Sequence, residues 1–392
     1  MLAAALPGEN GVEVMAGEGS SAGGAPSARE MWPVPAPPPA FLDGSREAEA
    51  QRLASAAREL VQLQQELRAV SADGRPGRAF HRMGVAFRAT YQPLPAGQLD
   101  PRLVPPEVRT ALLDPGLRVV DGFARFSHGR GDDNVNALMP DVRGIWVRLQ
   151  TSAGVQDLTA TNAEVPFFDD PEELLAFGFA TRRLVQEIRA HPLLTPAALL
   201  RYEPELAAQL MRLKAAEFSS KLEAHRRAVA MLAAVTAPGL PVHSLAETQF
   251  WSGAPLYIRG TNGRTYAFKF TFKPDPARGL PGLPTNDLFA ELGGRQQVHY
   301  ELRVQLYVDD QNTPIERPAK WQVPDAKVGD VDIATGEARI DALVDGEGSN
   351  PATNLDGLSP AGLNRLRADL YATSARGRGG RPVPDGRLFG QS

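Results

Sequence analysis

The chain has 392 residues, a formal net charge of −4, 43% hydrophobic residues and 22% charged residues, values ordinary for a globular protein with a large core. It contains no cysteine, which excludes disulfides, thiolate nucleophiles, iron–sulfur clusters and cysteine zinc sites. The near-neutral charge argues against a nucleic-acid partner, and no apolar run is long enough to span a bilayer. The histidines show no paired metal-ligand spacing.

Both ends of the chain have compositions typical of unstructured segments. Residues 1–44 are rich in Gly, Ala, Ser and Pro, and they bury too little apolar surface to offset the entropy of ordering. Residues 379–392 are predicted to be a second flexible tail, which leaves one domain at residues 45–378. Met1–Pro7 lack the basic region and apolar core of a signal peptide, so we expect a cytoplasmic protein.

The first regular element is a predicted helix, Ser45–Val70, with Ser45 as its cap. Apolar residues at helical spacing form one stripe along it, namely Leu53, Ala56, Leu60, Leu63, Leu67 and Val70. Such a stripe favours packing on another part of the same chain. Its alternative interpretation is the seam of a homo-oligomer.

Segments with strand character then follow in two groups. The first group is Val85–Tyr91, Val119–Phe126, Val142–Leu149 and Val155–Ala160, joined by Gly-rich and Pro-rich turns. The second group, Tyr266–Phe272 and Val298–Val308, alternates with period two, as half-buried strands do. A mostly helical insert, Thr181–Val235, separates the groups, and a helix that Asp170 caps precedes it. The expected fold class is α+β, an antiparallel barrel flanked by helices.

A last helix, Ser359–Ala375, carries the first sign of specific chemistry. Arg367 and Tyr371 are four residues apart and project from the same helix face. An adjacent arginine favours the phenolate form of tyrosine, and a phenolate is the proximal ligand of one class of haem protein. Taken alone, the pair is more typical of a surface Arg–Tyr stack.

Several separate stretches, in order along the chain, together resemble the haem-dependent catalase superfamily in its short, catalase-related branch. They are Arg78-x-x-His81-x-x-Gly84, Ala124–Ser127, Asp141–Gly144, Asp157-Leu158, Asn162, Pro166–Phe168, Phe250–Pro255, Gln305-Leu306, Thr313–Glu316, Trp321, Ser349–Pro351, Asn364-Arg365 and Arg367-x-x-x-Tyr371. The resemblance implies that the barrel encloses one haem b. It also implies an oxidoreductase that dismutates hydrogen peroxide.

Carried over to this chain, the resemblance implies a role for each matching residue. Tyr371 would ligate the haem iron, with Arg367 keeping the phenol ionised. His81 would shuttle a proton between the peroxide oxygens, work for which imidazole is suited, with Ser127 orienting it and Asn162 binding the peroxide. Arg78, Arg125 and Arg378 would contact the haem propionates. Phe126 and Phe167 would line the haem pocket, although packing in the protein core is an equally good interpretation of these two aromatic side chains.

The chain also departs from the family at positions near its histidine. Phe80 stands where catalases usually carry a small aliphatic residue, and Met83 stands where the family usually has lysine. These departures keep two alternatives open. One is an enzyme of the same fold that converts organic hydroperoxides or acts as a one-electron peroxidase, and the other is a non-catalytic barrel, with or without haem.

Overall fold

The computed structural model of the chain describes residues 31–41, 44–68, 80–129, 142–166, 168, 244–275, 287–344 and 348–377. The chain divides into two compact units, Met1–Trp32 and Pro33–Ser392, and all the elements named below belong to the second. The predicted insert Thr181–Val235 and the helix that Asp170 would cap lie outside the described residues. None of the described helices is long and apolar enough to cross a membrane.

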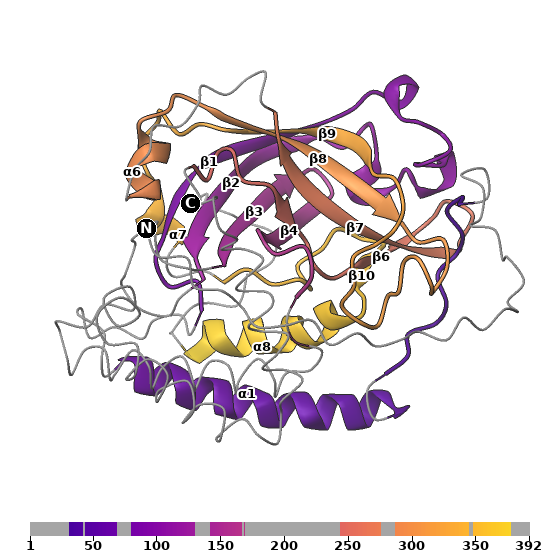
Figure 1. Cartoon of the computed structure of the whole chain (residues 1–392), viewed down its shortest axis with the longest axis horizontal. Coiled ribbons are helices and arrows are strands. Elements are labelled where there is room, and N and C mark those ends of the chain that lie inside the picture. The colour runs from indigo at the N-terminus through magenta and orange to yellow at the C-terminus, as the bar shows by residue number, and fades with distance from the viewer. Residues whose placement is uncertain are drawn as a thin grey trace, which may run out of the picture. The chain divides into compact units, whose positions relative to one another are not determined.

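The described strands form a closed antiparallel barrel, as predicted (Figure 1). They are β1 (Gly84–Pro93), β2 (Val119–His128), β3 (Arg143–Thr151), β4 (Gly154–Thr161), β5 (Phe250–Trp251), β6 (Leu256–Arg259), β7 (Thr265–Pro274), β8 (Val298–Leu306), β9 (Ala326–Ile333) and β10 (Leu358–Pro360). The short strands β5 and β6 both pair with β7 and share one wall of the barrel. β9 pairs with β1 and β8, and β8 pairs with β7, which closes the ring.

Side chains alternate between the inside and the outside of the barrel, as a pleated strand requires. The inside is a single apolar core that includes Phe87, Phe126, Ile145, Phe250 and Tyr300. The ring centroid of Phe126 lies 6.2 Å from that of Phe250 and 6.4 Å from that of Tyr300. Phe126 therefore packs in the barrel core, on the opposite face of β2 from Ser127, which favours the core-packing alternative for this residue.

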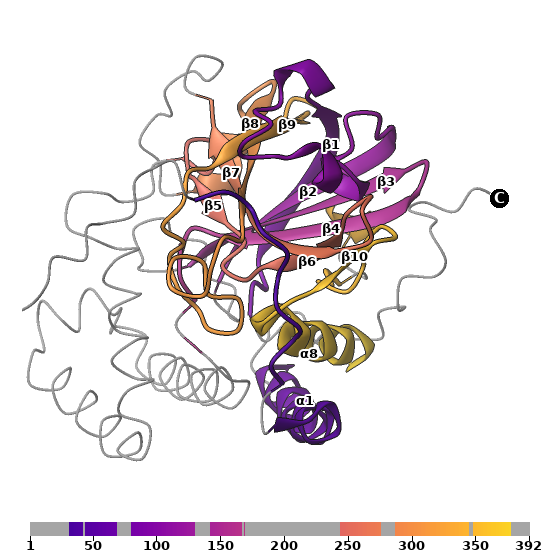
Figure 2. The ribbon, with the colours of Figure 1, turned by 90° about the vertical axis from the view of Figure 1, so that its right-hand side faces the viewer.

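Two long helices lie beside the barrel, α8 (Leu363–Gly377) next to it and α1 (Arg46–Arg68) against α8 (Figure 2). The Oγ atom of Ser45 accepts a hydrogen bond from the backbone N–H of Ala48 at 3.1 Å, as its predicted capping role requires. Leu53 and Ala56 of the predicted stripe are buried. Shorter helices are α6 (Leu288–Gly293), α7 (Asp341–Val344) and the 3-10 turns η2 (Ala96–Gln98), η3 (Pro106–Val108) and η4 (Ala111–Leu113).

The last helix begins later than predicted. Ser359 and Pro360 belong to β10, and α8 starts only at Leu363. Gly362 precedes the helix with a φ of +49°, and a Cβ at this position would overlap the carbonyl oxygen of Ile315. The turn into α8 therefore requires glycine, a local constraint that the apolar spacing of residues 359–375 does not reveal.

Part of the predicted N-terminal tail is ordered against the barrel. The backbone N–H of Val34 donates to the carbonyl of Tyr307 at 3.0 Å, and that of Ala36 donates to Thr265 at 2.8 Å. The proline-rich run thus pairs along β7 and the end of β8 through the N–H groups that its non-proline residues retain. Val34 and Ala36, which fall in the predicted tail, therefore contact the barrel through their backbone.

A buried ion pair fixes the chain after α7 to the outside of the barrel. Asp157 on β4 accepts hydrogen bonds from Nε and Nη2 of Arg148 on β3, at 2.7 Å and 2.8 Å. Its carboxylate also accepts from Nε1 of Trp146 and from the backbone N–H of Asn350. Both charged side chains are fully buried, so their mutual pairing and these extra donors are what offset the loss of hydration.

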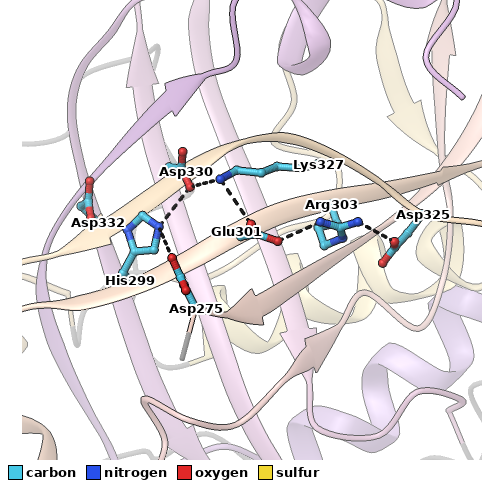
Figure 3. A network of polar contacts seen from close by, with 8 residues as sticks. All are labelled: Asp275, His299, Glu301, Arg303, Asp325, Lys327, Asp330 and Asp332. Atoms are coloured by element: carbon cyan, nitrogen blue, oxygen red, sulfur yellow. Dashed lines mark hydrogen bonds and ion pairs between the residues drawn. The ribbon is translucent and has the colours of Figure 1, made fainter. Parts of the chain in front are cut away.

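A ladder of charged side chains covers the outer face of β8 and β9 (Figure 3). Arg303 pairs with Asp325 at 2.9 Å, and Lys327 pairs with Asp330 at 2.8 Å. Nδ1 of His299 lies 2.7 Å from Asp332 and Nε2 lies 3.0 Å from Asp330, so carboxylates face both ring nitrogens. These contacts join the two strands that close the barrel.

Candidate functional site

One row of paired residues crosses five strands on the outside of the barrel. The row runs through Gly84 (β1), Ser127 (β2), Gly144 (β3), Thr161 (β4) and Trp251 (β5). Paired residues in antiparallel strands project on the same side, so the row forms one continuous strip opposite the core-facing residues. The predicted site residues attach to this strip at both of its ends.

His81 lies at the first part of the strip, in the turn that leads into β1. Its side chain is half-buried, and its backbone has a φ of +55°, which is uncommon for histidine. Nδ1 lies 3.0 Å from Oγ of Ser127, and the backbone N–H donates to the carbonyl of Gly129 at 3.0 Å. The imidazole also lies directly over Gly144, because a Cβ built there would be 2.8 Å from Cε1 and Nδ1. The predicted contact between His81 and Ser127 is therefore present.

Arg125 supports the turn that carries His81. Its guanidinium is buried and donates to the carbonyl of His81 at 3.2 Å and to that of Arg82 at 2.8 Å. These hydrogen bonds hold two successive carbonyls beside a residue with positive φ, so they stabilise a backbone conformation that is otherwise unfavourable. The contact of Arg125 with a haem propionate stays a prediction, and among the described residues its guanidinium contacts the turn that carries His81.

Asn162 follows the strip at the end of β4. Its Oδ1 accepts a hydrogen bond from the backbone N–H of Arg143 at 2.8 Å, and its own N–H donates to the carbonyl of Arg143 at 2.9 Å. The two bonds place Asn162 beside Gly144, the residue under the imidazole of His81. With Oδ1 engaged by a donor, the orientation of the amide is fixed, and the amide nitrogen is the end that can donate elsewhere.

Tyr371 and Arg367 lie on α8, beyond the other end of the strip. Oη of Tyr371 accepts from Nε of Arg367 at 3.2 Å and from Nη2 at 3.1 Å. Nη1 of Arg367 donates to the carbonyl of Ser252, the residue after Trp251, at 3.3 Å. Arg367 is buried and Tyr371 is half-buried. Both side chains thus project from the same face of α8, as their spacing predicted.

The histidine and the tyrosine are consequently anchored close to each other. Neighbouring strands are about 4.8 Å apart; two such spacings separate Gly144 from Trp251 and three separate Ser127 from it, so the anchor points lie about 10–15 Å apart. The turn before β1 therefore contacts this strip at Ser127, and the last helix contacts Ser252, the residue after its other end. The remaining predicted haem contacts, Arg78, Phe167 and Arg378, lie outside the described residues.

Solved structures of catalases have the same arrangement of strands. A fungal catalase covers 78% of this chain with a TM-score of 0.53 and 16% identity, and catalase A from Saccharomyces cerevisiae covers 78% with a TM-score of 0.53 and 15% identity. A bacterial catalase covers 81% with a TM-score of 0.54 and 16% identity. The fold is catalase-like. The matches cover 60%, 61% and 61% of those three proteins, so the chain spans less than two thirds of their length. No protein-family model matches the chain, and no curated protein matches its sequence.

The donor groups beside this catalase-like barrel suit a haem better than a bare metal ion. Within the described residues, no group of three His, Asp or Glu side chains converges as a metal site. The phenol oxygen of Tyr371, by contrast, accepts hydrogen bonds from two guanidinium N–H donors, and a tyrosine oxygen is the protein ligand of one class of haem protein. Haem supplies the other four ligands itself, so a single protein oxygen is sufficient.

The residues that support the predicted ones lie in stretches that carry the resemblance, but nothing in the sequence indicated their roles. Gly144 forms the surface under His81, and Ser252 receives Arg367 through its backbone carbonyl. Asn364, one turn before Arg367 on α8, contacts the same guanidinium. Only the spacing between Asn364 and Arg367 can be read from the sequence. The carbonyl of Ser252 and the missing side chain of Gly144 cannot, because neither depends on a functional side-chain group.

Proposed function

We propose that this protein is a haem-dependent enzyme acting on peroxide, with dismutation of hydrogen peroxide as its reaction. The observation that carries the proposal is that the His81–Ser127 pair and the Arg367–Tyr371 pair are anchored at the two ends of one strip on the barrel, with anchor points about 10–15 Å apart. In this proposal Tyr371 would ligate haem b, and Arg367 would hold its oxygen through the two hydrogen bonds that it donates. Arg78 and Arg378 are proposed partners of the propionates. The bound haem would supply the two-electron redox chemistry that amino acids lack.

The hydrogen bonds of Ser127 indicate which imidazole nitrogen handles the proton. Its Oγ donates to the carbonyl of Gly144 at 3.5 Å, a long bond, and this orientation leaves a lone pair for the N–H of His81 Nδ1. The lone pair of the neutral ring then lies on Nε2. We propose that Nε2 takes a proton from one peroxide oxygen and returns it to the other, as general acid–base catalysis requires. The amide nitrogen of Asn162 would donate a hydrogen bond to the bound peroxide.

Absorption spectra of the pure protein reconstituted with haem test the ligand. We expect the wild type and a Tyr307→Phe control to bind haem and give the same spectrum, and Tyr371→Phe to change the spectrum or lose the haem. Tyr307 is a suitable control because its hydroxyl donates to Asp310, on a loop after β8. An unchanged spectrum in Tyr371→Phe would contradict the ligand, and no haem binding by the wild type would contradict the proposed function.

Oxygen release and oxidation of a phenolic dye separate dismutation from the second candidate, conversion of organic hydroperoxides or one-electron peroxidation. Phe80, the half-buried residue before His81, favours this second candidate because it is bulkier than its usual catalase counterpart. Oxygen release from hydrogen peroxide supports dismutation. Turnover of dye or organic hydroperoxide without oxygen supports the alternative, and haem binding without any turnover indicates a non-catalytic barrel.

A further inference from the structure

The buried amide of Asn364 lies between Arg367 and the wall of the barrel. Asn364 occupies the first turn of α8, three residues before Arg367, and only 4% of it is exposed. Its Nδ2 donates to the carbonyls of Ala254 and Pro255, at 3.1 Å and 2.9 Å. Its Oδ1 accepts from Nη1 of Arg367 at 3.1 Å. The amide thus bridges the segment between β5 and β6 and the guanidinium that contacts Tyr371.

Only one orientation of this amide satisfies its surroundings. Rotating the amide by half a turn would face Oδ1 toward two carbonyl oxygens and would face the NH₂ group toward a guanidinium that can only donate. Each of those contacts would be repulsive in a buried site, where unsatisfied polar groups are costly. The carbonyls of Ala254 and Pro255 therefore fix which end of Asn364 faces Arg367.

The fixed oxygen in turn sets the rotation of the guanidinium. Nη1 of Arg367 is held by Asn364 and by the carbonyl of Ser252, and the opposite edge, Nε and Nη2, faces Oη of Tyr371. Ser252 is itself fixed to β7, because its N–H donates to the carbonyl of Phe270 at 2.9 Å and its Oγ accepts from the N–H of Phe270 at 3.2 Å. The chain of contacts runs without a break from the barrel wall to the phenol oxygen.

We propose that Asn364 is a positioning residue that holds Arg367 in the rotation that supports Tyr371. The proposal rests on the proposed function, since it assigns Tyr371 the role of haem ligand. Asn364 does not touch the reacting atoms and acts only through the arginine. Its other contribution, anchoring of α8 on the barrel, is structural, and the test must separate the two.

Three substitutions make this separation. Asn364→Ala removes the acceptor for Arg367 and both donors, whereas Asn364→Asp keeps an acceptor and removes the donors to the carbonyls of Ala254 and Pro255. Glu49→Gln is the matched control for α8 docking. Glu49 on α1 accepts from Nε and Nη2 of Arg365, at 3.1 Å and 3.2 Å, and so holds the same first turn of α8 without contacting Arg367.

The readout is hydrogen exchange at the Nε–H of Arg367, measured by NMR on the full-length, haem-free protein with ¹⁵N-labelled arginine. The resonance is identified by its absence in Arg367→Lys, and circular dichroism checks that each variant is folded. We expect exchange at least about tenfold faster in Asn364→Ala, because a hydrogen bond to a charged group is lost. Exchange in Asn364→Asp and Glu49→Gln should stay close to the wild-type rate.

Two results would overturn the proposal. One is an unchanged exchange rate in Asn364→Ala, and the other is equal acceleration in Asn364→Ala, Asn364→Asp and Glu49→Gln, which would mean that Asn364 only anchors the helix. If Asn364→Ala does not fold, Asn364→Ser takes its place and is judged by the same two results. Because no haem is present in this measurement, its outcome is independent of whether the protein proves to bind haem.

Discussion

The imidazole of His81 lies against Gly144, a residue 63 positions away in sequence and two strands away in the barrel. A Cβ at residue 144 would lie 2.8 Å from two ring atoms, closer than Cβ atoms approach other atoms in proteins, and 3.0 Å from Oγ of Ser127. The ring can therefore occupy its position only while residue 144 has no side chain.

Replacement of this glycine should displace the imidazole. We expect peroxide turnover by haem-loaded Gly144→Ala to fall about a hundredfold, since a shift of about 1 Å in a catalytic group has an effect of that size. Gly97→Ala is the control, because nothing lies within 4 Å of a Cβ at that position. Steady-state oxygen release measures both variants, and wild-type turnover in Gly144→Ala would show that His81 is not the acid–base group.

Removal of the Ser127 hydroxyl should also lower peroxide turnover, because this hydroxyl contacts the imidazole of His81. Ser127→Ala deletes the partner of Nδ1, so the ring loses its fixed tautomer and orientation. We expect about a tenfold to hundredfold loss of turnover, part of the usual contribution of acid–base catalysis, with partial recovery in Ser127→Thr. Ser359→Ala, at an exposed position, is the control. Equal rates in the Ala and Thr variants would argue against orientation by the hydroxyl.

The buried pair between Arg148 and Asp157 should dominate the stability of the segment after α7. Asp157→Asn removes the carboxylate charge that faces the buried guanidinium of Arg148, and we expect a loss of about 3–5 kcal/mol in the free energy of unfolding. The comparison is Asp121→Asn, which breaks an exposed pair with Arg88 and should cost less than about 1 kcal/mol. Urea denaturation measures both, and similar midpoints for the two variants would contradict this expectation.

Lys269 should make the free energy of unfolding depend on pH in the alkaline range. Its Nζ donates to the carbonyl of Ala319 at 2.7 Å, and burial lowers the pKa of its ammonium to about 8, against a smaller opposing effect of Glu164. Between pH 8 and 10.5 the folded protein releases this proton while the unfolded chain keeps it. The unfolded state then binds more protons, so the free energy of unfolding rises with pH.

The comparison with Lys269→Met isolates this effect. Relative to that variant, the wild type should gain on the order of 3 kcal/mol across pH 8–10.5, the equivalent of a pKa lowered from 10.5 to about 8, and the difference should be constant below pH 8. Lys320→Met, at an exposed neighbour, controls for general charge effects. Parallel stability curves for the wild type and Lys269→Met would show that the lysine is not buried in solution.

Alternation of apolar residues was sufficient to predict most of the barrel, but not all of it. β9 escaped prediction because its apolar residues change phase, Ala326 and Val328 in one register and Val331 and Ile333 in the other. The structure explains the change by a bulge opposite Leu302 and Arg303, where Val328 has no paired residue. The two-residue strand β5 is too short to show any period.

The candidate site was predictable where spacing within one element defines a contact. Arg367 and Tyr371 meet because four residues make about one helical turn. The contacts of Arg125 with the carbonyls of His81 and Arg82 were not predictable, because the positive φ of His81 cannot be read from residue types. The same holds for Asn364, since its partners Ala254 and Pro255 contribute only backbone atoms.

The way the barrel closes has a consequence for how the protein folds. β1 pairs with β9, which lies far away in the sequence; Ala89, for example, is paired with Ile333. Such a pairing requires the closure of a long loop, whose entropic cost precedes the stabilising contacts, so chains of this kind fold slowly. Destabilising substitutions along β9 would then be expected to lower the refolding rate and the yield of native protein, while molecules that do complete the ring would keep their full activity.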